Sequence, residues 1–400
     1  MVASVLMASA GTSFAAWLFL LRFRHGFWRA DQRLGDPPAP ARWPAVTAVI
    51  PARDEAATIG RVVRGLLAQH YPGQLTIVVV DDNSSDGTAP LARDAAAGSE
   101  RVRLVAGQPL EPGWTGKLWA VHQGIQAALA EWPATEFLLL TDADILHDPT
   151  NVRRLVAKAT AERRDLVSLM VRLHCVSAVE RLLIPAFVFF FQKLYPFPAA
   201  NDPSHRVAAA AGGCMLVRRA ALEQAGGVAA IRGALIDDCA LAAAIKRNGP
   251  IWIGLADHTH SLRPYRGLRD VWDMVARTAY TQLDHSVAKL LGTVLGMAFL
   301  YLVPPIALAW GAVAENASML AAGGGGFALM LVAYRPTWSI YGRRLGPAFF
   351  ALPVTALLYT LSTIASALRH WRGRGGAWKG RTYPAPDSAK STVEFPGRPG

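Results

Sequence analysis

Four long apolar segments lie near the two ends of this 400-residue chain, and they limit the folds that it can adopt. One runs from residue 3 to 21, and three lie toward the carboxyl end, at 290–313, 317–334 and 347–368. Each is about long enough to cross a hydrocarbon core of ~30 Å as a helix. The residues between the first two segments have ordinary polarity and suffice for one large domain. The sequence therefore predicts a globular body that is joined to a membrane at both ends.

Basic residues beside the apolar segments predict the orientation of the body. The first segment lacks the basic start of a secretory signal peptide and is followed by Arg22, Arg24 and Arg29. Because positive charge resists translocation, we expect a retained anchor and a cytoplasmic body at the inner (plasma) membrane of a bacterial-type cell. The net charge of +12 lies mostly near apolar segments, which favours anionic lipid headgroups over nucleic acid as the partner. Simple solubilising charge is the alternative.

These patterns divide the chain into five parts. The predicted parts are an anchor at 1–22, a basic, proline-rich linker at 23–44, the cytoplasmic body at 45–285, membrane segments at 286–370 and a basic disordered tail at 371–400. Three spans after a cytoplasmic body would leave the basic tail outside, against the positive-inside rule. We therefore expect two to three spans, and the segment with Pro353 is the candidate for a re-entrant one.

The body alternates strand and helix patterns. Buried strands are predicted by short apolar runs at 46–50, 75–80, 102–105 and 137–141, and helices by the spacing at 58–69 and 118–129. This alternation predicts an α/β fold with a doubly wound, mostly parallel sheet. Such sheets bind their ligands at the carboxyl ends of the strands.

One apolar stretch, 182–191, is too short to span a membrane and contains three consecutive phenylalanines. It predicts an interfacial helix with its apolar face in the lipid and Lys193 outside. A buried core helix is the alternative.

Acidic residues follow the first two predicted strands. The first strand leads into the segment from Pro51 to Glu55, and the second into the segment from Asp81 to Thr88. Carboxylates at these positions can accept hydrogen bonds from a ribose or a base. The chain has no glycine-rich dinucleotide loop and no P-loop, which excludes a Rossmann dehydrogenase and a P-loop NTPase. Either segment alone could instead cap a helix.

The fourth predicted strand ends in Thr141-Asp142-Ala143-Asp144. Residues two apart in an extended chain point to the same side, so both carboxylates can face one cation. Mg²⁺ and Mn²⁺ prefer such oxygen ligands and link them to phosphates. The sequence therefore predicts a divalent metal site at this strand end.

Three further segments carry candidate ligand-binding groups. Lys117 enters a helix from a glycine-flanked turn, where it can meet a phosphate or remain a surface lysine. Gly212 and Gly213 precede a strand-like run, where the backbone can lie close to a sugar. Asp237 and Asp238 begin an apolar helix. Either of them can cap that helix or deprotonate an acceptor hydroxyl.

Together these segments resemble the family-2 inverting glycosyltransferases in order and spacing, over roughly residues 45–285. The segment from Gly113 to Ala120 and the flanking apolar segments are most similar to the hopanoid-cluster-associated glycosyltransferases, relatives of the ceramide glucosyltransferases. The resemblance implies a GT-A-type fold, a nucleotide diphosphate sugar donor such as a UDP-sugar, a Mg²⁺ or Mn²⁺ cofactor and a lipid acceptor.

The resemblance also implies a role for each matching residue. Near the nucleotide it places Ala52, Asp54, Glu55 and Asp82, and near the diphosphate Lys117. It makes Asp144 the principal metal ligand with support from Asp142, and Asp238 the general base with Asp237 as the competing candidate. Gly213 stays a candidate for the sugar site.

Arg277 matches the arginine of the family's glutamine-arginine-tryptophan motif, and it is a further candidate of the donor site. Thr278 and Tyr280 replace the expected aromatic pattern, which argues against processive polymer synthesis. Three alternatives remain open: a polyprenyl-phosphate glycosyltransferase, a polysaccharide synthase and a non-enzymatic membrane scaffold.

Overall fold

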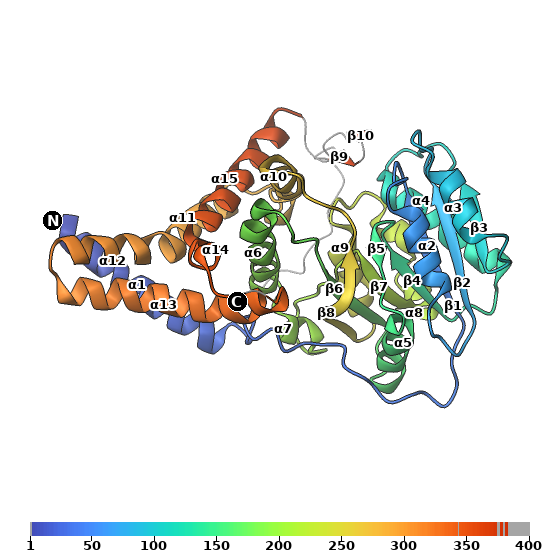
Figure 1. The fold of residues 1–400 in the computed structure, drawn as a ribbon, viewed down its shortest axis with the longest axis horizontal. Helices are drawn as coiled ribbons and strands as arrows, with labels where there is room; N and C mark the ends of the chain where they lie inside the picture. Colours follow the sequence, from blue (N-terminus) through green and yellow to red (C-terminus); the bar gives the residue numbers. More distant parts are fainter. Residues whose placement is uncertain (1, 343, 374–376, 379–380, 383–400) are drawn as a thin grey trace, which may run out of the picture.

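A computed structural model describes residues 2–342, 344–373, 377–378 and 381–382. An α/β body lies at one end of the molecule and a bundle of apolar helices at the other (Figure 1). The amino terminus lies at the tip of the bundle, at its greatest distance from the body. The body therefore meets the bundle at one side only.

One eight-stranded sheet, in the order β3-β2-β1-β4-β7-β6-β8-β5, forms the centre of the body. Its strands are β1 (Val46–Ala52), β2 (Leu75–Asp81), β3 (Val102–Ala106), β4 (Phe137–Thr141), β5 (Ile145–Leu146), β6 (Leu166–Arg172), β7 (Cys214–Arg218) and β8 (Ile251–Ser261). Strands β3, β2, β1 and β4 are parallel, whereas β7 runs antiparallel to β4 and β6. The predicted mostly parallel sheet is confirmed, and the four predicted strands begin at the expected residues.

Helices cover both faces of the sheet. One face packs against α2 (Ile59–Leu67), α3 (Thr88–Ala96) and α5 (Asn151–Ala161). The other packs against α4 (Gly116–Glu131), α8 (Arg219–Gln224), η1 (Val228–Ile231) and α9 (Asp237–Lys246).

A glycine sets how closely α4 approaches the sheet. A Cβ atom at Gly124 would lie 2.5 Å from Val49 Cγ1 and 2.9 Å from Val80 Cγ2. Contacts this short would force the helix away, since packed interiors leave no such space. The close fit of α4 on β1 and β2 fixes its first turn, with Lys117, near the carboxyl ends of the strands.

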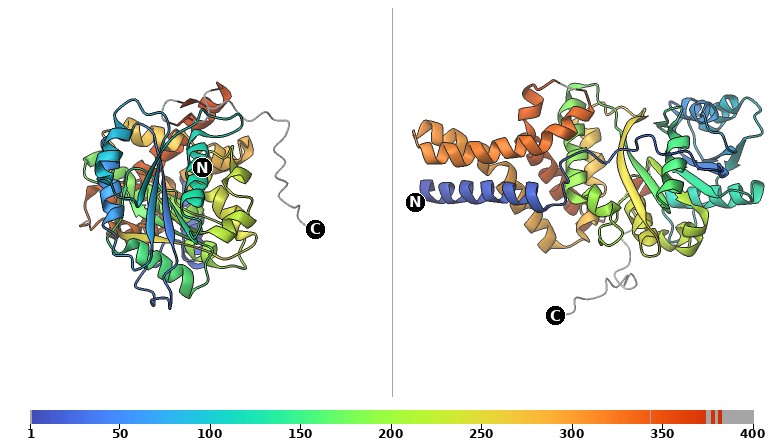
Figure 2. Two further views of the ribbon diagram at one scale, coloured as in Figure 1. Left: turned by 90° about the vertical axis from the view of Figure 1, so that its right-hand side faces the viewer. Right: turned by 90° about the horizontal axis from the view of Figure 1, so that it is seen from below.

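Three apolar helices form the bundle: α1 (Val2–Phe23), α12 (Val303–Val313) and α13 (Ala317–Ile340). Helix α11 (Val287–Tyr301) precedes α12, and the two are separated at Leu302, just before two prolines that cannot continue a helix's hydrogen bonds. The turn between α12 and α13 lies at the tip of the bundle beside the amino terminus (Figures 1 and 2). Helix α12 therefore runs away from the body, and α13 returns to it.

The last long helix, α15 (Leu352–Trp371), takes a different position. It follows α14 (Pro347–Phe350) and packs mainly on α6 (Ala178–Leu194), α10 (Leu268–Ala276) and α11. In Figure 1 it lies beside the body, across the direction of α13. By length and composition, four helical stretches could cross a membrane: Ala3–Phe23, Val287–Val313, Ala317–Ile340 and Leu352–Trp371. The first three contain the apolar segments expected from the sequence, and the fourth covers most of the segment expected at 347–368.

Helix α6 shows that the expected position of Lys193 is wrong. Ile184 and Phe189 are completely buried, because α6 packs against α13 and α15. The Lys193 ammonium group turns inward, donates to Tyr301 Oη at 3.0 Å and lies 5.5 Å from the centre of the Trp17 ring. The buried core helix, the alternative interpretation, describes this segment better.

The remaining described elements are short. They are α7 (Phe197–Asn201), η2 (Thr281–Leu283), β9 (Ala377–Trp378) and β10 (Arg381–Thr382). Most of the predicted basic tail, 371–400, lies outside the described residues.

Candidate active site

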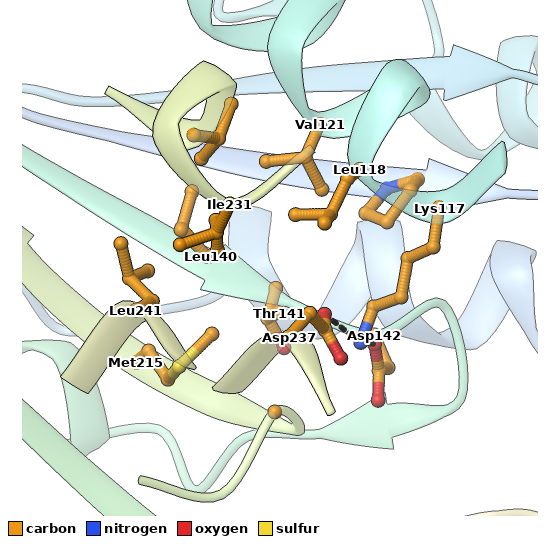
Figure 3. Close-up of a pocket in the computed structure, with 13 residues that line it drawn as sticks. Lys117, Leu118, Val121, Leu140, Thr141, Asp142, Met215, Ile231, Asp237 and Leu241 are labelled. Atoms are coloured by element: carbon orange, nitrogen blue, oxygen red, sulfur yellow. Dashed lines mark ion pairs between the residues drawn. The ribbon is translucent and has the colours of Figure 1, made fainter. Parts of the chain in front are cut away.

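A pocket lies where the carboxyl ends of β1 and β4 meet the first turns of α4 and α9 (Figure 3). Lys117, Asp142 and Asp237 stand together at one side of it. The opposite wall is apolar and consists of Leu118, Val121, Leu140, Met215, Ile231 and Leu241. The pocket therefore has one charged side and one apolar side. It lies at the carboxyl ends of the strands, where α/β folds bind ligands.

Lys117 links the charged groups of the pocket. The hydroxyl of Thr115 accepts a hydrogen bond from Leu118 N at 3.4 Å and so caps α4, which holds Lys117 in the first turn. The Nζ atom of Lys117 lies 3.0 Å from Asp142 Oδ1 and 3.1 Å from Asp237 Oδ2. Burial lowers the pKa of Lys117, but the two carboxylates outweigh it and hold the pKa above its usual range. The lysine is thus a fixed positive charge at a helix N-terminus, as phosphate sites require.

Asp238 follows Asp237 in the first turn of α9, and its negative charge also stabilises protonated Lys117, but it is not among the residues that line the pocket. Its Oδ2 accepts a hydrogen bond from Gly212 N at 2.9 Å, and its Oδ1 accepts one from Cys239 N at 2.7 Å. Burial, with the charge of Asp237, raises the pKa of Asp238 to about 6. A Cβ at Gly212 would lie 3.2 Å from Lys117 Nζ, so a small residue is needed there. A carboxylate with a pKa near neutrality suits a general base.

Asp142 and Asp144 follow β4 and have different partners. Asp142 pairs with Lys117, and Asp144 Oδ2 accepts a hydrogen bond from Arg263 Nε at 2.6 Å. Desolvation raises the pKa of Asp142, and the nearby charge of Asp144 adds to this rise, while Lys117 opposes it. The two carboxylates are therefore close enough for their negative charges to repel each other.

The donor set at Asp142 and Asp144 can be compared with the needs of a divalent ion. Within the described residues, no group of three or more histidine, cysteine, aspartate or glutamate side chains is arranged to hold a metal. Mg²⁺ is commonly bound by one or two carboxylates together with substrate phosphates. Asp142 and Asp144 fit that pattern, because they supply hard oxygen ligands and leave the remaining positions to a substrate.

The predicted nucleotide-binding residues lie together at the ends of β1 and β2. Asp82 is 1% exposed, and its backbone N donates to Ala52 O at 2.8 Å. Arg53 Nη1 donates to Asp82 O at 2.6 Å. Asp54 Oδ1 accepts a hydrogen bond from Ser85 N at 2.8 Å, so this carboxylate holds the two loops together. Glu55 turns toward Arg263, with which it forms an ion pair.

Two of the predicted site residues, Gly213 and Arg277, are not among the residues that line the pocket. Gly212, rather than Gly213, lines the pocket, since a Cβ at Gly213 would meet Ile145 and Val171, both at 3.3 Å. Arg277 is exposed and directly follows α10. Burial raises the pKa of Tyr265, and the positive charge of Arg277 partly opposes this rise. Whether either residue contacts a donor stays a prediction.

Arg263 was not predicted from the sequence, although it pairs with both Asp144 and Glu55. It follows β8, a strand that the sequence analysis also missed. The sequence signal that could have found it is its position, shortly after a run that begins with the apolar residues Ile251, Trp252 and Ile253.

Replacing Lys117 with methionine is expected to destabilise the protein. The change leaves Asp142 and Asp237 without their shared cation, which should cost about 2–3 kcal/mol, less than a fully buried pair because water reaches Asp142. Thermal unfolding in detergent measures this loss. Lys289→Met, which removes an exposed lysine paired with Asp284, is the control and should change little. Equal midpoints for the two variants would contradict the proposed role of Lys117.

Comparisons with known proteins place this site in a family. The family described as "Glycosyltransferase like family 2" matches residues 44–257, more than half of the chain. The succinoglycan biosynthesis protein ExoO of Rhizobium meliloti (strain 1021) is 35% identical over 167 residues, which cover 38% of this chain and 44% of that protein. The 4,4'-diaponeurosporenoate glycosyltransferase of Staphylococcus aureus (strain USA300) is 33% identical over 101 residues, 25% of this chain and 24% of that protein. The chain thus spans less than half the length of these relatives.

A solved structure shares the fold over almost the whole chain. The mannosyltransferase PcManGT from Pyrobaculum calidifontis, in complex with GDP-Man and Mn²⁺, superposes with a TM-score of 0.54. The match covers 93% of this chain and 99% of that one, at 20% sequence identity. The family match, together with a GT-A-like sheet that has its charged pocket at the carboxyl ends of β1 and β4, leads to one conclusion: this chain belongs to the glycosyltransferase-like family 2.

Proposed function

We propose that this protein transfers a sugar from a nucleotide diphosphate donor to a hydroxyl group of a membrane lipid, with inversion at the anomeric carbon. One observation supports this most strongly: three carboxylates from two distant segments, Asp142, Asp237 and Asp238, act on the ammonium group of Lys117. A fourth, Asp144, lies close enough to Asp142 to act on it. A diphosphate needs such a cation, and an acceptor hydroxyl needs such a base. The donor bound in PcManGT, GDP-Man, supports the same class of substrate.

In the proposed reaction, some residues act on the donor and others on the acceptor. Lys117 exchanges its carboxylate partners for the diphosphate oxygens and stabilises the charge that develops as the nucleotide leaves. Asp238, held by Gly212 N and Cys239 N, accepts the proton of the acceptor hydroxyl as that oxygen attacks the sugar. A divalent ion held by Asp144 and Asp142 would add Lewis-acid stabilisation of the leaving diphosphate. The Mn²⁺ in PcManGT supports this cofactor.

The position of the base supports a lipid acceptor. Tyr195, at the end of α6, lies close enough to Asp238 that the carboxylate charge adds to the effect of burial and raises the pKa of Tyr195. Helix α6 packs in turn against α13 and α15, so this helix links the base to the apolar helices. We infer that the acceptor enters from this side with its apolar part in the bilayer. The resemblance to the hopanoid-associated enzymes supports a hopanoid-like alcohol.

We also propose a membrane topology. Three spans would be formed by α1, by α11 with α12, and by α13, with α15 lying on the side of the body. Arg369, near the end of α15, pairs with Asp273 of α10 and supports this placement. The basic residues at the end of α15 then stay on the side of the body, as the positive-inside rule requires. This arrangement agrees with the expectation from the sequence that one C-terminal segment does not cross the membrane.

A donor and acceptor panel tests the proposed function. Purified enzyme with Mn²⁺, labelled nucleotide sugars and membrane lipid extract should yield a lipid-soluble product that is stable to mild acid, because the sugar is linked to a hydroxyl. A mild-acid-labile product would identify a polyprenyl-phosphate acceptor instead, and a water-soluble polymer would identify a polysaccharide synthase. Either result would contradict the proposal.

A further inference from the structure

Arg263 is placed beside Asp144 by the backbone. The end of β8 pairs with β5, so that Ser261 lies opposite Ile145. Leu262 N then donates to Asp144 O at 2.7 Å. The next residue, Arg263, therefore starts from a fixed position next to the carboxylate, although 119 residues separate the two in sequence.

The guanidinium group of Arg263 bridges two acids. Its Nε donates to Asp144 Oδ2 at 2.6 Å, and its Nη2 donates to Glu55 Oε1. The side chains of Asp144 and Glu55 are 10% and 11% exposed, whereas that of Arg263 is 40% exposed. Two nearly buried carboxylates thus share one arginine, which balances only one of their two negative charges and keeps access to solvent. The arginine can therefore leave without crossing the protein interior.

We propose that Arg263 is a latch that occupies the cation position at Asp144 while no donor is bound and gives up that carboxylate when the divalent ion arrives with the nucleotide sugar. The inference rests on the proposed function, because it assumes that Asp144 is a metal ligand. A divalent ion bound by Asp144 would lie beside the guanidinium group of Arg263, and the two cations would repel each other. The metal alone must therefore compete with Arg263, whereas the metal with a diphosphate gains additional ligands and prevails.

The latch also connects the donor site to the helices beside the membrane. Tyr265, two residues after Arg263, donates from its backbone N to Glu180 Oε1 at 2.7 Å, in the first turn of α6. Helix α10 begins at Leu268, immediately after this loop. Movement of Arg263 away from Asp144 would thus shift a loop that is anchored on both α6 and α10. The effect of donor binding would thus be transmitted through this loop to the acceptor side.

Mn²⁺ binding to the full-length protein in the absence of nucleotide tests the latch. The loss of free Mn²⁺ signal in electron paramagnetic resonance gives the dissociation constant directly. Arg263→Gln removes the competing cation and should lower that constant about fivefold. Arg266→Gln is the matched control, because it removes an exposed positive charge three residues along the same loop. At physiological salt its effect should stay below about twofold.

A second variant and a second readout keep the test independent of folding. Arg263→Lys keeps the charge but not the two-pronged geometry, so its Mn²⁺ affinity should lie between those of wild type and Arg263→Gln. Without metal, the unfolding temperature of Arg263→Gln should fall, and Mn²⁺ should raise it more than it raises that of wild type. Unchanged or weaker Mn²⁺ binding by folded Arg263→Gln would overturn the latch.

The same titration separates the latch from the proposed function. If wild type binds Mn²⁺ together with UDP and Asp144→Asn does not, the metal role of Asp144 stands, and only the Arg263 variants decide the latch. If wild type binds no Mn²⁺ even with UDP, the metal role and the latch are both wrong.

Discussion

Replacing Asp238 with asparagine should lower kcat by about 10²- to 10⁴-fold and leave the affinity for the nucleotide sugar nearly unchanged. The amide cannot accept the acceptor's proton at neutral pH, whereas the donor contacts at Lys117 and Asp144 remain. Release of nucleoside diphosphate measures turnover, and calorimetric titration with the donor measures affinity. Retained turnover in a folded Asp238→Asn protein would reject Asp238 as the base.

Asp237→Asn is the matched control, because the two acids are adjacent at the start of α9 and only one of them is paired with Lys117. This variant should lose less turnover than Asp238→Asn, because Asp238 still provides the base. A larger loss in Asp237→Asn than in Asp238→Asn would make Asp237 the base instead.

The pH profile of wild type gives an independent check on the same residue. Burial and the charge of Asp237 raise the pKa of Asp238 to about 6 in the donor-free protein. Only the deprotonated form can act as a base, so kcat/KM should rise with pH up to about 6 and level off above it. Asp238→Asn should lose this limb, because it has no carboxyl group to titrate at that position.

Replacing Asp144 with asparagine should reduce kcat/KM by about 10²- to 10³-fold and remove the dependence of donor binding on Mn²⁺. The neutral amide is a much weaker ligand than a carboxylate, and its loss leaves only Asp142 for the ion. Titration with UDP, with and without Mn²⁺, measures this effect. Equal enhancement of UDP affinity by Mn²⁺ in wild type and in Asp144→Asn would contradict the metal role.

Asp142→Asn provides the comparison within the same strand end. Asp142 is paired with Lys117, and its carboxylate is more exposed than that of Asp144. We therefore expect this variant to retain part of the Mn²⁺ dependence that Asp144→Asn loses. A complete loss in Asp142→Asn alone would exchange the roles of the two residues.

Much of the body could be predicted from sequence, because its first half follows local rules. The strands β1, β2 and β4 are short, mainly apolar runs that lead into polar segments, and the acids of the proposed site lie in these segments or begin a helix. Since parallel strands share one carboxyl edge, chain positions far apart come together there without any further information.

The features that were missed depend on tertiary contacts. Arg263 reaches Asp144 only because β8 pairs with β5, and no local pattern reports a pairing across 119 residues. Helix α6 is similar: a run of phenylalanines looks the same whether lipid or protein covers it. Its burial follows from α13 and α15, which pack against it from the other end of the chain.

A structure of the full-length protein with Mn²⁺ and UDP tests the central claim most directly, namely that these separate acids form one donor site. We expect the diphosphate beside Lys117, the ion bound by Asp144, and Asp238 facing the open side of the pocket next to α6. A nucleotide bound away from the ends of β1 and β4, or an ion that does not contact Asp144, would contradict the account.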